Sequence, residues 1–137
     1  MNTSAIPPAA QPFEETFRTW VAASLAEAIP TVVKAFVFNL LEYGETPSGR
    51  FGIELVGTGI FDEDDSDWAC YEVWEPSVRR LEIPLGFSGS SWEECLERVT
   101  SLLMTGLNSP DLGPKLKQGA AIGIGFVDGD LSVAWQR

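Results

Sequence analysis

The sequence predicts an α+β fold, in which a mainly antiparallel sheet of about six strands carries two helices packed on one face. Two segments show the helical spacing of apolar residues, and the segments around them alternate apolar and polar residues as strands do. Short links between consecutive strands favour hairpins and therefore antiparallel neighbours. The expected order is helix, four strands, helix and two strands, in a single domain at 12–137 that follows a flexible N-terminal arm at 1–11.

The first helix is expected to begin at Pro12, which suits a first helical position, and to end near Pro30. Its apolar residues form one stripe, which we expect to pack on the sheet. The stripe consists of Phe13, Phe17, Trp20, Val21, Leu25 and Ala28.

Four strands are predicted between the helices, at 32–43, 51–61, 68–75 and 80–85, with a turn at 44–49. The first is apolar on both faces, which is typical of a central strand. Pro84 cannot donate a hydrogen bond and places the fourth at an edge or near its own end.

Ser91 and Glu94 have the spacing of a capping box and mark the start of the second helix, with Gly106 as its stop. Its predicted inner face is Trp92, Cys95, Leu96, Val99, Leu102 and Leu103.

A hairpin is predicted to close the chain, with a type I′ turn at Asp128-Gly129. One face of its first strand holds only Gly and Ala, at 119, 121, 123 and 125, and we expect a helix rather than a ligand to lie there.

The net charge of the chain indicates which classes of partner it can bind. Nine basic and twenty acidic residues give a net charge of −11, which repels nucleic-acid phosphates and anionic membranes. A basic protein would instead be attracted. The alternative is that the acidity serves solubility alone.

Histidine is absent from the sequence, which excludes Ser-His-Asp and Cys-His catalysis. Cys70 and Cys95 form no CxxC motif, so neither a metal nor any other cofactor is predicted; we expect two buried free thiols. The N-terminus lacks the features of a secretory signal, and the longest apolar stretch is too short to span a bilayer. A cytoplasmic, non-enzymatic protein is the expectation.

The candidate partner-binding residues surround an acidic run. Carboxylates interleaved with Trp offer charge for attraction and aromatic area for tight contact. The set is Asp62, Glu63, Asp64, Asp65, Asp67, Trp68, Glu72, Trp74 and Glu75. The alternatives are a solvated acidic turn, a metal site that lacks the spacing of an EF-hand, and tryptophans that belong to the core.

Two stretches carry a resemblance to a known group of proteins. They are Glu54-Leu55-Val56-Gly57-Thr58 with Phe61-Asp62, Asp67-Trp68-Ala69-Cys70 and Glu72-Val73, and Gly125-Phe126-Val127-Asp128-Gly129-Asp130-Leu131. Together they resemble small bacterial proteins similar to the immunity proteins of polymorphic and contact-dependent toxin systems, over roughly residues 33–136. The resemblance implies a cytosolic antidote that binds a cognate toxin domain, and it transfers no active residue.

The leading hypothesis is therefore an immunity protein that blocks a basic toxin, such as a nuclease, by electrostatically steered binding. A general adaptor that acts as a homodimer through its sheet edge is the second hypothesis. An enzyme that uses carboxylates or a metal is the third.

Overall fold

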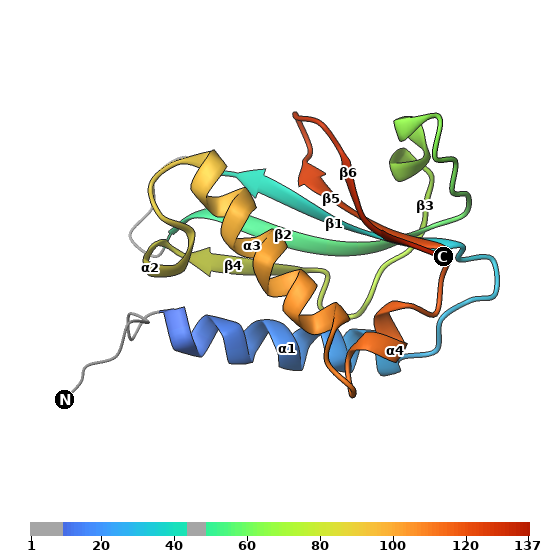
Figure 1. Ribbon diagram of the computed structural model, residues 1–137, viewed down its shortest axis with the longest axis horizontal. Helices are drawn as coiled ribbons and strands as arrows, with labels where there is room; N and C mark the ends of the chain where they lie inside the picture. Colours follow the sequence, from blue (N-terminus) through green and yellow to red (C-terminus); the bar gives the residue numbers. More distant parts are fainter. Residues whose placement is uncertain (1–9, 44–48) are drawn as a thin grey trace.

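In the computed structural model, which describes residues 10–43 and 49–137, six strands form one sheet, and helices α1 and α3 cover one of its faces (Figure 1). The predicted α+β class is confirmed. The longer elements are α1 (Ala10–Ala26), β1 (Ala35–Glu42), β2 (Gly49–Thr58), β3 (Glu72–Trp74), β4 (Arg80–Pro84), α3 (Trp92–Leu107), β5 (Ala121–Phe126) and β6 (Ser132–Gln136). The sequence did not predict the short helices η1 (Ser66–Cys70), α2 (Leu85–Ser88) and α4 (Gly113–Leu116).

The strands lie in the order β3-β2-β1-β5-β6, and β4 also pairs with β2. The pairs β1–β2, β2–β3, β2–β4 and β5–β6 are antiparallel, as predicted. The central pair β1–β5 is parallel. The mainly antiparallel sheet that the sequence predicts therefore has one parallel pair at its centre, because the chain between these two strands includes α2, α3 and α4 and returns on the helical side.

Helix α1 begins at Ala10, two residues before the predicted start at Pro12. The first N–H groups of a helix have no partner within it, so a proline in the first turn removes no hydrogen bond. The helix ends at Ala26, so Ala28 lies outside it. Residues 1–9 of the predicted arm and 44–48 of the predicted turn lie outside the described residues.

The N-cap of the predicted capping box of α3 is confirmed, whereas the Glu94 carboxylate accepts from the N–H of Ser90 rather than from that of Ser91. Ser91 Oγ accepts a hydrogen bond of 3.2 Å from the backbone N–H of Glu94, whose carboxylate accepts one of 3.3 Å from the N–H of Ser90. The helix continues through Gly106 to Leu107. Gly106 therefore does not end the helix. It is buried, and a Cβ at this position would lie 3.1 Å from the side chain of Leu112.

The two faces of the sheet bury different amounts of apolar surface. Under the helices lies a large core that includes Phe17, Phe38, Leu55, Val99 and Ile122. A smaller cluster on the other face consists of Ala35, Val37, Val56, Trp68 and Ala121.

The Gly/Ala face of β5 lies on the side of this smaller cluster, and no long helix among residues 10–43 and 49–137 covers it. A Cβ on Gly123 would meet the Trp68 ring at 3.2 Å and Leu131 at 3.1 Å. The expected helix is thus replaced by one tryptophan from the short η1 and a leucine from the segment before β6.

The predicted type I′ turn of the last hairpin is wrong. That turn requires positive φ at both central residues, and among the described residues only Gly89 has a positive φ, of 75°. The N–H of Gly129 instead donates to the carbonyl of Phe126 at 2.9 Å, which makes Val127 and Asp128 the central residues.

Candidate functional site

The acidic run forms an exposed loop that organises its own backbone. Asp62 Oδ1 accepts a hydrogen bond of 2.9 Å from the N–H of Asp64, and Asp65 Oδ1 accepts one of 3.0 Å from the N–H of Asp67. The second bond caps η1. Glu63 accepts a bond of 2.7 Å from the side chain of Gln136, which ties the loop to β6.

Trp68, which belongs to the predicted binding site, is buried in the structure. The predicted strand at 68–75 is wrong over its first residues, because the capped turn at Asp65 directs the chain into the 3₁₀ helix η1 instead. Trp68 is only 1% exposed, and its ring packs edge to face on Phe61 with centroids 5.0 Å apart. Trp68 is therefore part of the core.

Trp74 is also an inward residue. Its ring lies edge to face on Phe36, with centroids 6.0 Å apart, and it packs against the large core. The prediction that these two tryptophans stand among the carboxylates as binding anchors does not fit their positions.

Glu72 and Glu75 differ from the carboxylates of the acidic loop because both form ion pairs, and the partner of both is Arg79. Nη1 of Arg79 contacts Glu72 and lies 2.8 Å from Glu75, and Nη2 lies 2.8 Å from Glu72. The same guanidinium bonds to Glu54 at 3.2 and 3.3 Å, and Arg80 bonds to Glu54 at 2.9 Å. These contacts form an ion network at the β2–β4 edge.

Glu54 is the buried member of this network, at 5% exposure. Burial alone would raise the pKa of its carboxyl group, but hydrogen bonds from Arg79 and Arg80 outweigh burial and hold the pKa below its ordinary value. The hydrogen bonds that Arg79 donates, first to Glu72 and then to Glu54, raise the pKa of Arg79. Glu54 therefore stays ionised, whereas a general acid needs a raised pKa.

No group of three or more Cys, Asp or Glu side chains in the described residues is arranged to hold a metal ion. The loop carboxylates that bond to backbone N–H groups serve the local turn.

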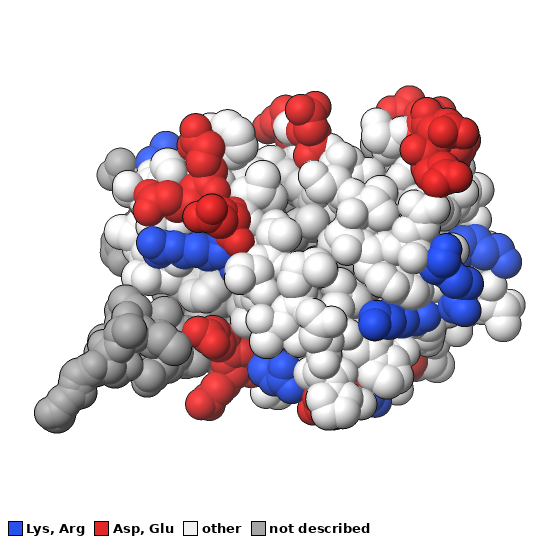
Figure 2. All heavy atoms as spheres, viewed as in Figure 1, with Lys and Arg blue, Asp and Glu red and all other residues white. Residues whose placement is uncertain are grey.

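Negative charge gathers along one edge of the molecule, and Lys and Arg gather near α4 and the C-terminus (Figure 2). We call this the acidic edge: the loop 62–67, the β5–β6 turn with Asp128 and Asp130, and Glu93 in the first turn of α3. In the described residues no ion pair joins a Lys or Arg to this loop or turn. The charge of these carboxylates is therefore uncompensated.

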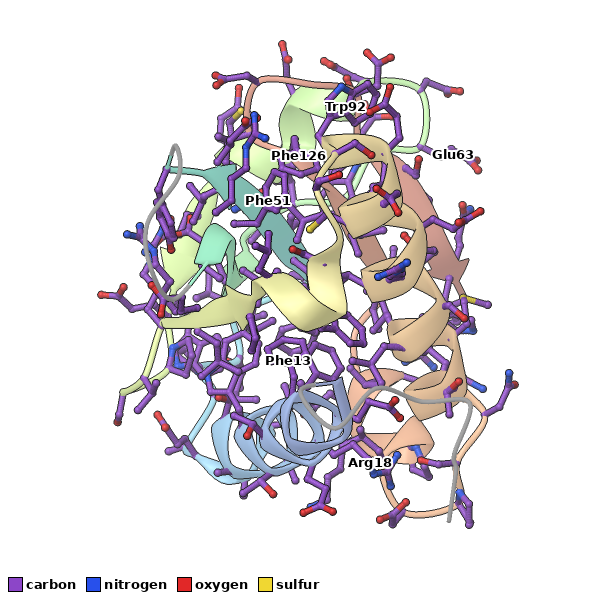
Figure 3. The ribbon with its side chains drawn as sticks, turned by 90° about the vertical axis from the view of Figure 1, so that its left-hand side faces the viewer. Phe13, Arg18, Phe51, Glu63, Trp92 and Phe126 are labelled. Carbon is purple, nitrogen blue, oxygen red and sulfur yellow. The ribbon has the colours of Figure 1, made fainter. Side chains whose placement is uncertain are left out.

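A groove of about 630 Å³ lies on the acidic edge between α3 and the β5–β6 turn. Its lining comprises Glu42, Trp92, Leu96, Phe126, Val127, Asp128, Gly129, Asp130 and Ser132, and we call it the Trp92 groove. Figure 3 shows the rings of Phe51, Phe126 and Trp92 in succession from the core outward. Their consecutive centroids are 5.7 and 6.1 Å apart.

The sequence pattern assigned Trp92 to the inner face of its helix, but the residue is 52% exposed. It stands in the first turn of α3, where the helix faces the end of β1 and the β5–β6 turn rather than the middle of the sheet. Val127 is exposed to the same extent. The one sequence feature that could have indicated the exposure of Trp92 is its position as the first helical residue, directly after the N-cap Ser91.

A second groove, of about 640 Å³, lies on the opposite face of the sheet, and the β5–β6 turn borders both. Glu54, Asn39 and Gly125 are neighbours across three strands and line it, together with Asp67 and Arg79. Three of its charged lining residues, Glu54, Glu72 and Arg79, are paired with one another in the Arg79 network.

The two cysteines are free, as expected, but only one is buried. Cys95 lies in the core, and burial, together with the charge of Glu42, raises the pKa of its thiol to about 12. Cys70 is exposed at the end of η1, because the strand that would have buried it does not form.

No family model matches the chain, and no curated protein and no solved structure resembles it significantly. None of the helices in the described ranges combines the length and the apolar character that a bilayer crossing requires.

Proposed function

We propose that this chain is a non-catalytic, cytoplasmic protein-binding module that neutralises a basic partner, as immunity proteins neutralise their cognate toxins. The observation that carries the proposal is the acidic edge, where the unpaired carboxylates of Asp128 and Asp130 line a groove together with the exposed side chains of Trp92 and Val127. Interfaces with high affinity combine an aromatic anchor with a polar rim.

The distribution of ion pairs supports this proposal. Five arginines are paired with carboxylates outside the loop 62–67 and the β5–β6 turn, namely Arg18, Arg50, Arg79, Arg80 and Arg98. The negative charge on the acidic edge is therefore available to attract a basic surface, and such attraction accelerates association. A partner that acts on nucleic acid needs a basic cleft, and a protein docked over that cleft would block it sterically.

The first experiment uses the gene directly upstream of the one that encodes this chain. We expect it to encode a secreted protein whose C-terminal domain arrests growth when expressed alone in a bacterial host and does not when this chain is co-expressed. An upstream gene for a metabolic enzyme, or an arrest that co-expression leaves unchanged, would contradict the proposal.

A second experiment measures association of the purified pair. Reversing the charge of Asp64, Asp65 and Asp67 together is expected to slow association, most strongly at low salt, because screening shortens the range of the attraction. An unchanged association rate would show that the loop 62–67 does not attract the partner.

One observation favours the homodimeric adaptor as a second candidate. Strand β6 is an outer strand of the sheet, and its residues Ser132–Gln136 include neither a charge nor a proline, the usual protections of an edge. Two copies could pair through it. Light scattering would then show a dimer that Val133→Pro converts to a monomer, whereas a wild-type monomer would reject this candidate.

A further inference from the structure

We infer that the Trp92 groove is the docking site for an arginine side chain on a basic segment of the protein partner. The inference rests on the proposed function and deepens it, because it separates the place that holds the partner from the loop that attracts it.

The groove has an apolar floor and wall. Trp92 lies edge to face with Phe126 at an interplanar angle of 84°, and Leu96 and Val127 complete the apolar lining. Trp92 and Val127 are each 52% exposed, so the groove offers apolar area that this chain itself does not bury. The methylene stem of a long side chain would remove that area from water.

The rim of the groove is anionic. Asp128 and Asp130 belong to the lining, and in the described part of the chain neither forms an ion pair or accepts a side-chain hydrogen bond. Glu42 also lines the groove and is already paired with Arg50 at 2.7 Å. The two turn carboxylates are thus the acceptors that a bound cation would find unoccupied.

A guanidinium fits this combination better than an ammonium. It is planar, it can stack on the face of an indole, and it donates in a fork that matches a carboxylate. A cation over a tryptophan ring is attracted by the ring itself. The chain already shows a guanidinium over an aromatic ring, where Arg50 lies 5.6 Å from the ring centroid of Phe51.

The occupant is supplied by the partner, because in the described residues no arginine of this chain pairs with Asp128 or Asp130. Arg50 pairs with Glu42 at one side of the groove, and Arg98 pairs with Glu94. Charge complementarity with a chain of net charge −11 then favours a basic segment over an acidic or neutral one.

The probe for the test is a blocked tetra-arginine peptide, titrated into the isotopically labelled protein at low salt and followed by NMR. We expect saturable shifts centred on the Trp92 indole and on the amides of Val127, Asp128 and Asp130. Absence of saturable binding, or shifts centred on the loop 62–67, would overturn the inference.

Matched variants separate a specific site from general attraction. Asp128→Asn with Asp130→Asn is expected to weaken peptide binding about tenfold, whereas Asp64→Asn with Asp65→Asn, which changes net charge equally, should weaken it about twofold or less. Equal weakening by the two pairs would show that charge alone binds the peptide.

The aromatic contribution is tested on α3 itself. Trp92→Ala is expected to weaken binding about tenfold, and Met104→Ala, which truncates another exposed residue of the same helix, should leave it unchanged. A blocked tetra-lysine peptide should bind severalfold more weakly than tetra-arginine; equal affinity would reject the preference for a guanidinium. Co-expression rescue together with a negative peptide titration would refute the groove and leave the proposed function standing.

Discussion

The ring of Trp92 meets the ring of Phe126 edge to face, with centroids 6.1 Å apart, and this contact joins the first turn of α3 to the end of β5. Phe126 in turn contacts the buried Phe51 of β2. The exposed tryptophan is thus held by a short path of rings that leads into the core. An anchor positioned in this way is ordered before a partner arrives, which reduces the entropy lost on binding.

Truncation of two tryptophans is predicted to destabilise the protein to very different extents. Trp68→Ala should lower the free energy of unfolding by about 3–5 kcal/mol, because it empties a site that is 1% exposed. Trp92→Ala should lower it by about 1 kcal/mol or less, because that side chain is half exposed. Urea unfolding followed by circular dichroism measures both, and a larger loss for Trp92→Ala would contradict these positions.

Arg79→Met is predicted to cost about 2–3 kcal/mol of unfolding free energy. The change leaves the buried carboxylate of Glu54 with Arg80 alone and leaves Glu72 and Glu75 without their cation. Arg80→Met is the matched control and should cost about 1 kcal/mol or less, since its half-exposed side chain makes one bond to Glu54. Equal losses in chemical denaturation would show that Arg79 is not the centre of the network.

Stability should fall in acid through the protonation of Glu54. Its folded-state pKa is lowered below the ordinary 4.5, so its ionised form stabilises the fold above that pH, and the stabilisation is lost as pH falls through the folded-state value. Urea midpoints measured downward from neutral pH should therefore decline below about pH 4.5. Glu54→Gln should show a flatter decline there, and identical slopes would argue against Glu54 as the group responsible.

Gly125→Ala is predicted to destabilise the protein by about 1–3 kcal/mol. A Cβ there would meet the carbonyl oxygen of Asp130 at 2.5 Å and the Cα of Leu131 at 3.2 Å, and backbone atoms cannot rotate away. Gly129→Ala is the control, because its nearest neighbour, the Cβ of Phe126, is 3.6 Å away and its φ is not positive. Similar unfolding midpoints for both variants would contradict the close approach at Gly125.

The two thiols should differ in reactivity. At about pH 8 an aromatic disulfide reagent is expected to modify Cys70 in the native protein and both cysteines in denaturant, because the thiolate is the reactive form and burial raises the pKa of Cys95 to about 12. Cys70→Ser should then abolish native-state labelling. Rapid labelling of Cys95 in the folded protein would show that this part of the core opens readily.

Features set by neighbouring residues could be predicted from the sequence. The stripe from Phe13 to Leu25 and the N-cap of the Ser91–Glu94 capping box depend on spacings within a few turns of helix, and both are present. The parallel pairing of β1 with β5 could not be predicted, because it joins strands that are far apart in the sequence, and short links describe only consecutive strands.

Of the candidate site, the sequence could predict the clustering of acidic residues but not the arrangement of the aromatic residues around them. The five carboxylates of the loop 62–67 are exposed in the structure. The aromatic partners were misassigned, because alternation gives Trp68 a face but cannot show that a capped turn at Asp65 replaces the strand. Likewise, helical periodicity placed Trp92 on the inner stripe without showing that the first turn of α3 meets the β5–β6 turn.

The parallel contact between β1 and β5 also sets an order of assembly during synthesis. Strand β1 ends at Glu42 and its neighbour β5 begins at Ala121, so a nascent chain that has reached α4 still has one side of its central strand unpaired. The ladder closes only when the last hairpin emerges. A ribosome stalled before that hairpin would therefore hold a chain with an open, apolar strand edge, a substrate for chaperones rather than a smaller version of the folded protein.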